Sequence, residues 1–399
     1  MQRNRLDVST KIGTWLNPSY PIPQYQRPTD WLVLPNVSVG QQKLVGLYAV
    51  HNNHSNFASV LCAGNYTVDW GDGTSDNVSS GNKIDHLYIY ADIPAYTECS
   101  RGYRQVIITI TPQAGQTLTS ISLQQRHSSD GNVYCTGWLD IRVAGSSITA
   151  FGVGGGTVYN RMLEQFEWVG TNSITSFSAF FAHCWSLQKV VALYTTSGTN
   201  FGQMFDGCRA LREIPLLITT NCNSTMAYMF RSCKSLVTIP LLDTSNCPVF
   251  TEMFSYCDSL RTIPLLNTSK ATGMAYMFYE CTSLEMIPNL DVHLVTNFTQ
   301  MFLDCYCLHY VNFSNVAAGT TYDSMFYNCW SLRVGILGGL NQTFTYVNCQ
   351  LAREELVDIF NSLAVVVGKT LTITGNWGVA SLSVAEKAIA TDKGWTLSL

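Results

Sequence analysis

The sequence is poor in charge and has no cluster of positive charge. Only 13% of its 399 residues are charged, the formal net charge is −4, and lysine and arginine never form a run. Because nucleic-acid and anionic-membrane ligands call for a basic patch, we expect neither kind of partner. The hydrophobic content of 46% is enough for sizeable cores. A chain of this length predicts about two to three domains.

Long apolar runs are also missing. The longest purely apolar run, residues 363–367, is far shorter than a membrane-spanning helix requires. Residues 1–30 contain no apolar stretch of the length found in a secretory signal peptide. We therefore expect no membrane insertion and no obvious N-terminal export route.

Sequence signatures of catalysis are absent as well. None of the seven histidines belongs to an H-E-x-x-H motif or neighbours a C-x-x-C motif, and no G-x-S-x-G elbow is present. Glu164 and Glu167 could in principle form the carboxylate pair of a glycosidase, with no further support in the sequence. We predict a protein that is not an enzyme and that uses no cofactor.

What the sequence does have is one recurring phrase. It combines Met-Phe, a cysteine three residues later, a leucine three residues after that and, in most copies, an Ile-Pro pair. Its cysteines recur every 24 or 25 residues, at Cys184, Cys208, Cys233, Cys257, Cys281, Cys305 and Cys329. This period is that of leucine-rich repeats, which stack into a solenoid because a single repeat cannot bury its apolar face.

Each repeat predicts one coil made of a short strand and a short helix. Leu236, Ile239 and Leu241 fit the inward positions of the strand, which the following prolines limit to three or four residues. The apolar stripe expected for about two helical turns consists of Met226, Met229, Phe230 and Cys233. The cysteine column is interpreted as reduced core thiols, with some disulfides or a metal site as the alternatives.

The phrase resembles BspA-like leucine-rich repeats of the mycoplasma-lipoprotein type, whose unit runs M-F-x-x-C-x-S-L-x-x-I-P-x-L-D-T-S-x-x-T-x-M. The resemblance covers about residues 170–349. In that family such arrays occur on bacterial surface proteins and in phage-encoded virion proteins, so the resemblance implies binding and display. The C-terminal phrases T-I-T-G-N-W-G and D-K-G-W-T-L resemble the ends of phage-encoded proteins with these repeats.

Strand and turn signals precede the repeats. The phrase V-D-W-G-D-G-T, followed by H-L-Y, resembles a PKD-type immunoglobulin-like unit, which implies a β-sandwich over residues 31–113. The sequence departs from that pattern by a long insert after Tyr88 and by the position of Tyr103. Weak candidates for a calcium site are Asp69, Asp72 and Asp76, because hard cations bind several oxygens. The alternative is that these carboxylates only form the turn.

The two ends of the chain have different patterns. Residues 1–30 are rich in proline and predict an extended N-terminal docking arm, with a tail that binds nothing as the alternative. The docking residues would be Trp15, Tyr20, Tyr25 and Arg27. The solenoid is expected over 114–349, with atypical coils to about 170, and a C-terminal α/β cap over 350–399. In the cap, Ser383 and Glu386 predict a capping box that opens a helix.

Together these observations predict a multidomain chain in which a β-sandwich precedes a leucine-rich-repeat solenoid. The expected function is that of a phage virion structural protein, a fibre or decoration protein that displays its repeats for adhesion or host recognition. Its partners would be other virion proteins, through the arm, and a host-surface glycan or protein, and we expect an oligomeric or multicopy protein located in the virion. A bacterial cell-surface adhesin is the second hypothesis, and a glycan-degrading enzyme is the third.

Overall fold

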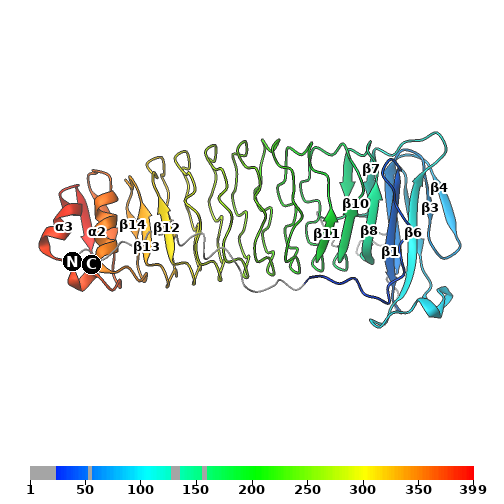
Figure 1. Ribbon diagram of the computed structural model, residues 1–399, viewed down its shortest axis with the longest axis horizontal. Coiled ribbons are helices and arrows are strands. Elements are labelled where there is room, and N and C mark those ends of the chain that lie inside the picture. The colour runs from blue at the N-terminus through cyan, green and yellow to red at the C-terminus, as the bar shows by residue number, and fades with distance from the viewer. Residues whose placement is uncertain (1–23, 53–55, 127–134, 155–159) are drawn as a thin grey trace.

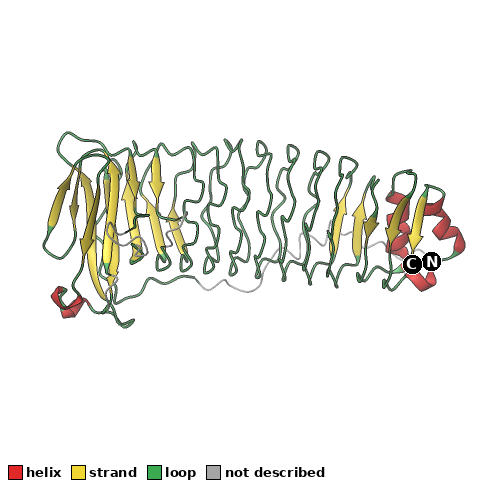
Figure 2. Cartoon of the chain, turned by 180° about the vertical axis from the view of Figure 1, so that it is seen from behind, coloured by secondary structure: helices red, strands yellow, loops and turns green. Residues whose placement is uncertain are grey.

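The computed structural model describes residues 24–52, 56–126, 135–154 and 160–399. It is one elongated stack with two β-sheets at one end, irregular coils in the middle and a small α/β cap at the other end (Figures 1 and 2). Among the described residues no helix is long and apolar enough to cross a membrane.

The larger sheet joins the N-terminal strands to the first coils of the solenoid. Its order is β11-β10-β8-β1-β6-β3-β4. Their bounds are β1 Lys43–Val50, β3 Tyr66–Asp69, β4 Ser75–Val78, β6 Arg104–Pro112, β8 Trp138–Ala144, β10 Gln165–Trp168 and β11 Lys189–Ala192. Strand β1 pairs antiparallel with both β6 and β8, while β8, β10 and β11 are parallel. The sheet thus passes without a break across residue 113, where the sequence predicts the end of a sandwich.

A second sheet packs against the first one. It has the order β5-β2-β7-β9, with β2 at Phe57–Ala63, β5 at Lys83–Leu87, β7 at Ser120–Ser122 and β9 at Ala150–Gly152. The Tyr48 hydroxyl on β1 donates a hydrogen bond to the Phe57 carbonyl at 2.6 Å, and the Tyr66 hydroxyl on β3 donates one to the Val60 carbonyl at 3.0 Å. Two short 3₁₀ turns, η1 at Tyr90–Asp92 and η2 at Ala95–Thr97, lead into β6.

The Met-Phe-Cys segment of each coil is a run of tight turns, so the short helices expected in the repeats are wrong. Within residues 226–233 the N–H groups of Met229, Arg231 and Cys233 bond three residues back, inside the coil. The alternating N–H groups of Tyr228, Phe230 and Ser232 bond to carbonyls of the next coil. An α-helix would use every one of these groups internally. We call this segment of each coil the turn run.

The apolar residues of the turn run are nevertheless buried as the sequence predicts. Met226, Met229, Phe230 and Cys233 are all inaccessible to solvent. The phenylalanines of successive coils stack with ring centroids 5.4–5.7 Å apart. Each column cysteine from Cys208 to Cys329 donates its thiol to a phenylalanine carbonyl of the preceding coil, for example Cys257 to Phe230 at 3.0 Å. The sequence predicts that these thiols are packed in the core, but it does not predict that they also donate hydrogen bonds between coils.

The Ile-Pro-Leu-Leu segment differs from the expected strand. Between β11 and β12 (Tyr310–Phe313) the described chain has only isolated β-bridges. Leu236, Ile239 and Leu242 are buried, whereas Leu241, predicted to point inward, is 62% exposed. Inward residues thus recur every three positions, the period of polyproline II, and not every two as in a strand. A proline in each segment favours this backbone because it fixes φ and removes an N–H donor. We call it the proline–leucine segment.

The C-terminal cap closes the stack. It contains β13 Val334–Leu337, β14 Phe344–Thr345, α2 Arg353–Ser362, β15 Lys369–Thr372, the 3₁₀ turn η3 Val379–Ser381, α3 Val384–Thr391 and β16 Trp395–Ser398. Strands β14, β15 and β16 form a parallel sheet. The predicted capping box is present, since Ser383 and Glu386 exchange hydrogen bonds at the start of α3.

Candidate functional site

The coils present two outward surfaces with distinct chemistry. One is formed by the outward residues of the turn runs and is rich in tyrosine; we call it the tyrosine face. The other is formed by the outward residues of the proline–leucine segments, and its most exposed column is apolar. Both surfaces repeat with the coil spacing, so each is a row of similar positions.

Aromatic side chains gather on the tyrosine face in the later coils. The ring of Tyr279 lies 5.2 Å from that of Tyr256 and 6.0 Å from that of Tyr276. Further along, Tyr306 and Trp330 stack with their ring centroids 4.9 Å apart and their planes 20° apart. Trp330 is 51% exposed, so this stacked pair remains open to solvent on the protein surface.

The backbone holds these rings at unusual positions. Tyr228, Tyr256 and Tyr276 all have φ near +60°, as do the equivalent residues of the other coils. A turn with this φ at its third residue favours glycine, and a bulky side chain there is strained. Only one coil has a glycine in the column just before the cysteine, Gly207. Because Gln203, Ser232 and Ser324 adopt the same φ, this conformation belongs to the turns of every coil, and it fixes the outward direction of whichever side chain stands there.

Carboxylates lie among the rings of the tyrosine face. Burial, followed by hydrogen bonds with Glu280 and Tyr256, raises the pKa of the Tyr279 hydroxyl above its ordinary value. Asp304 accepts a hydrogen bond from the Asn328 amide at 2.7 Å, in the same pair of coils as Tyr306 and Trp330. Rings beside acceptor groups can bind a ligand that offers both an apolar face and hydroxyl or ammonium donors.

Arginines dominate the same face in the earlier coils. Trp185 lies between the guanidinium groups of Arg161 and Arg209, which are 4.1 Å and 4.3 Å from its ring centroid. Arg231 lies over the Tyr228 ring and binds the buried carboxylate of Asp206 through two nitrogens, at 3.0 Å and 2.6 Å. The face therefore changes from arginine-rich to tyrosine- and carboxylate-rich along the solenoid.

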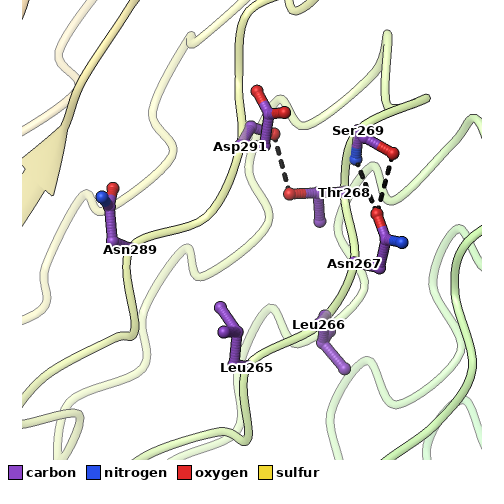
Figure 3. A pocket seen from close by; sticks show the side chains of 7 residues that line it. All are labelled: Leu265, Leu266, Asn267, Thr268, Ser269, Asn289 and Asp291. Carbon is purple, nitrogen blue, oxygen red and sulfur yellow. Dashed lines mark hydrogen bonds between the residues drawn. The ribbon is translucent and has the colours of Figure 1, made fainter.

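The opposite surface carries the exposed apolar column, which we call the leucine stripe. It consists of Val191, Leu216, Leu241 and Leu265, with exposed fractions of 44%, 72%, 62% and 62%. A cavity of about 340 Å³ opens beside its last member, between Leu265 and Asp291 (Figure 3). The cavity wall includes Thr268, whose hydroxyl donates to the Asp291 carbonyl at 2.7 Å.

The three aspartates proposed for calcium are each engaged in protein hydrogen bonds. Asp69 accepts from the Gly71 N–H at 3.0 Å, and Asp76 accepts from the Trp70 indole at 2.8 Å. Asp72 accepts from Thr74 and lies 2.7 Å from a ring nitrogen of His86. Within the described residues, no group of three or more His, Cys, Asp or Glu side chains is arranged to hold a metal ion.

Two of the four predicted docking residues can be placed, and both pack on this chain. Arg27 forms an ion pair of 2.7 Å with Asp140, whose side chain is fully buried. Burial, and then the charges of Glu164 and Asp140, raise the pKa of the Tyr25 hydroxyl. Trp15 and Tyr20 lie outside the described residues. Residues 24–30 are thus attached to the larger sheet of this chain.

The carboxylates of the glycosidase alternative have separate partners. Glu164 is buried and pairs with Arg101, while Glu167 lies 3.3 Å from Arg142. The geometry of this pair therefore gives the enzyme hypothesis no support.

All fourteen cysteines are free thiols, and Cys307 is the exposed one. Burial raises the pKa of Cys62 and Cys349 to about 12 and, in the turn runs, raises the pKa of thiols such as Cys233 and Cys281. A thiol that stays protonated is a poor nucleophile and a poor metal ligand. The column therefore acts in packing and hydrogen bonding.

The solved structures that match this chain include two repeat proteins of low similarity. The leucine-rich-repeat protein of T. pallidum is 22% identical, with a TM-score of 0.33, over 48% of this chain and 83% of that one. An internalin (InlF) from Listeria monocytogenes is 13% identical, with a TM-score of 0.21, over 70% of this chain and 86% of that one. Among the curated proteins, none matches this chain.

A family model matches the coils themselves. The family described as "Mycoplasma protein of unknown function, DUF285" matches residues 156–262 and 224–336. These spans cover the turn runs, the cysteine column and the proline–leucine segments described above. The match supports a BspA-like leucine-rich-repeat protein.

Proposed function

We propose that the protein is a recognition or adhesion protein that binds a partner surface through its tyrosine face. The observation that carries this proposal is the row of aromatic rings on successive coils, with Tyr256 beside Tyr279 and Tyr306 stacked on Trp330. Tyrosine and tryptophan contribute large contact areas at little cost in side-chain entropy, and they are enriched in binding surfaces.

The scaffold suits such a role. Each turn run is bonded to both neighbouring coils, so the outward side chains of successive coils keep fixed relative positions. A preorganised surface loses less conformational entropy on binding. The ligand class that fits best is a surface polysaccharide or glycoprotein, because sugar rings stack on aromatic faces and their hydroxyls donate to carboxylates such as Asp304.

The place of action in this proposal is a phage virion, where the protein would be a fibre or decoration component. The support is the resemblance of the repeats and of the C-terminal phrases to phage-encoded proteins. Within the same proposal, the PKD-like β-sandwich would be the region that joins the solenoid to the rest of the particle. Display on a bacterial cell surface is the second candidate, and it rests on the same repeats.

Binding can be tested with a matched set of variants. Tyr327, which is 57% exposed, lies in the same turn run as Trp330. Trp330→Ala and Tyr327→Ala should each weaken retention of the protein on host-cell polysaccharide by roughly five- to thirtyfold, the range of an interface anchor worth about 1–2 kcal/mol. Val367→Ala is the control, since Val367 is 93% exposed and lies in the cap. Unchanged retention in both aromatic variants would refute the tyrosine face as the binding surface.

The location requires a separate measurement. Mass spectrometry of purified virions should find the protein among the structural components. Its absence from virions, together with its recovery from the surface of a bacterium, would favour the cell-surface alternative and would leave the binding result intact.

A further inference from the structure

The leucine stripe is a second surface that the tyrosine face does not explain. Large apolar side chains are normally buried, and a contiguous exposed group of them usually marks an interaction site. Here Leu216, Leu241 and Leu265 occupy the same position in three consecutive coils and are each at least 62% exposed. The sequence repeats a solvent-facing leucine where a polar residue would be less prone to aggregation.

The stripe is continuous and narrow. The stacked phenylalanine rings of these coils are 5.4–5.7 Å apart, so the leucines follow one another at about that spacing. The proline before each leucine, at Pro215, Pro240 and Pro264, is itself partly exposed and widens the apolar surface. A single column of apolar residues matches one extended chain segment in shape.

Negative charge borders the stripe on one side. Asp243 and Asp291 each follow an inward leucine and are exposed. Hydrogen bonds from Ser245 hold the pKa of Asp243 below its usual value, and a hydrogen bond from His293 does the same for Asp291. Among the described residues Asp243 forms no ion pair, while Asp291 lies 2.7 Å from a ring nitrogen of His293 and has no lysine or arginine partner. Cationic side chains of a ligand could therefore bind there.

The same surface already holds an extended segment on the preceding coils. Residues 24–28 have no regular secondary structure and lie against the coils of β8 and β10, with Arg27 bound to Asp140. Hydrogen bonds from Lys189 and then Gln24 hold the pKa of Glu213 below its usual value, which places Gln24 next to the start of the stripe. An arginine on a carboxylate beside apolar contacts is thus a mode of binding that this surface supports.

We infer that the leucine stripe is a docking site for an extended, basic, proline-containing polypeptide segment of a partner protein. The segment would lay apolar side chains on Leu216, Leu241 and Leu265 and place lysine or arginine on Asp243 and Asp291. At a rise of roughly 3.1 Å per residue in polyproline II, the three coil steps from Val191 to Leu265 take about five or six residues. Such segments lose little conformational entropy on binding because they are already extended in the free state.

Fluorescence anisotropy with the full-length protein tests this inference. The probe is a labelled peptide of three Pro-Leu-Arg repeats, about nine residues and roughly 28 Å long in polyproline II. A twin peptide carries glutamate in place of arginine. The arginine peptide should bind about tenfold more tightly than its twin, because only its charges complement the bordering carboxylates.

Variants locate the binding. The double variant Leu241→Ser/Leu265→Ser should weaken the arginine peptide about tenfold, and Asp243→Asn/Asp291→Asn should abolish its advantage over the twin. All four positions are exposed, so the fold should be kept, which circular dichroism checks. Val367→Ser, in an exposed position of the cap, is the matched control and should change nothing.

Every other result overturns the inference. Equal affinity for both peptides, binding that the leucine variants leave unchanged, or no binding at all would each remove the docking site. Binding that appears only in a variant lacking residues 1–23 would assign the stripe to the chain's own N-terminal residues. A dimer in analytical ultracentrifugation that dissociates on Leu241→Ser would assign it to a second copy.

Discussion

The turn run and the proline–leucine segment of one coil reach burial by different means. In the turn run, alternating N–H groups bond to the next coil, and rings, thiols and backbone are all in register. In the proline–leucine segment few such bonds exist: the N–H of Val237, for example, reaches the Arg212 carbonyl only at 3.5 Å. Here successive coils are held together by the packing of inward leucines and by hydrogen bonds from threonine side chains. For example, the Thr244 hydroxyl donates to the Asn267 carbonyl at 2.8 Å.

This difference in backbone bonding suits the tyrosine face and the leucine stripe to different kinds of binding. A backbone held by bonds on both sides can keep strained tyrosines outward, which suits preorganised recognition. In the proline–leucine segment, proline prevents regular backbone pairing with the neighbouring coil. The outward leucines and aspartates of this segment are therefore available to bind an extended segment of a partner protein.

Alkaline pH should have the largest effect, because it acts on all the thiols of the turn runs together. Burial raises the folded-state pKa of these thiols, such as Cys233, and raises that of Cys349 to about 12, so the folded state holds the protons more tightly than the unfolded chain. Their stabilising contribution is complete below pH 9 and is lost as the pH rises toward 12. Each thiol costs up to about 1.4 kcal/mol per pH unit in that window.

Urea unfolding at neutral pH and at about pH 10.5 measures this loss. The exposed Cys307 serves as the control, since Cys307→Ala should leave the pH profile unchanged. A free energy of unfolding that stays constant over this range would show that the thiols do not couple to folding.

The adjacent leucines of one proline–leucine segment give the next largest effect. Leu242→Ala should lower the free energy of unfolding by about 2–5 kcal/mol, because Leu242 is 1% exposed and its removal leaves a cavity. Leu241→Ala should change it by less than about 0.5 kcal/mol. Equal costs in chemical denaturation would contradict the three-residue period of this segment.

Substitution of a buried cysteine of the column and of its exposed neighbour compares the stability that each side chain contributes. Cys305→Ala should cost roughly 1–2 kcal/mol, since it removes a buried side chain and the thiol donor to the Phe278 carbonyl. Cys307→Ala, in the same coil, should cost almost nothing. Native-state labelling should modify one thiol, Cys307, quickly and the others only after denaturation. Rapid labelling of several thiols in the folded protein would show that the column is open to solvent.

The smallest effect should come from backbone strain in the turn run. Ser232 has φ = +58°, so Ser232→Gly should be neutral or stabilising by up to about 1 kcal/mol. Ser235→Gly, outside the positive-φ positions, should be destabilising by a similar amount. Thermal unfolding of the two variants compares them directly. A loss of stability in Ser232→Gly equal to that in Ser235→Gly would mean that the turn run carries no strain there.

The period of the repeats and the buried residues of the turn run could be read from the sequence, because they depend on side-chain chemistry that recurs every 24 or 25 residues. Met226, Met229, Phe230 and Cys233 are buried as expected, and the capping box that opens α3 is where the pattern predicts. The aromatic rings of the tyrosine face were present in the sequence, but their grouping was not evident because the face combines residues from different coils.

The stacking of the coils sets how the backbone of each coil satisfies its polar groups. The 3, 4 and 7 spacing of Met226, Phe230 and Cys233 fits a helix, yet the next coil offers carbonyls to half of the N–H groups, and turns result. The L-x-x-L-x-L pattern fits a strand, yet the proline places Leu242 inward and Leu241 outward. The sequence by itself determined which side chains are apolar and how often they recur. The neighbouring coil decided the conformation, because its backbone competes with local hydrogen bonds and no single repeat contains that information.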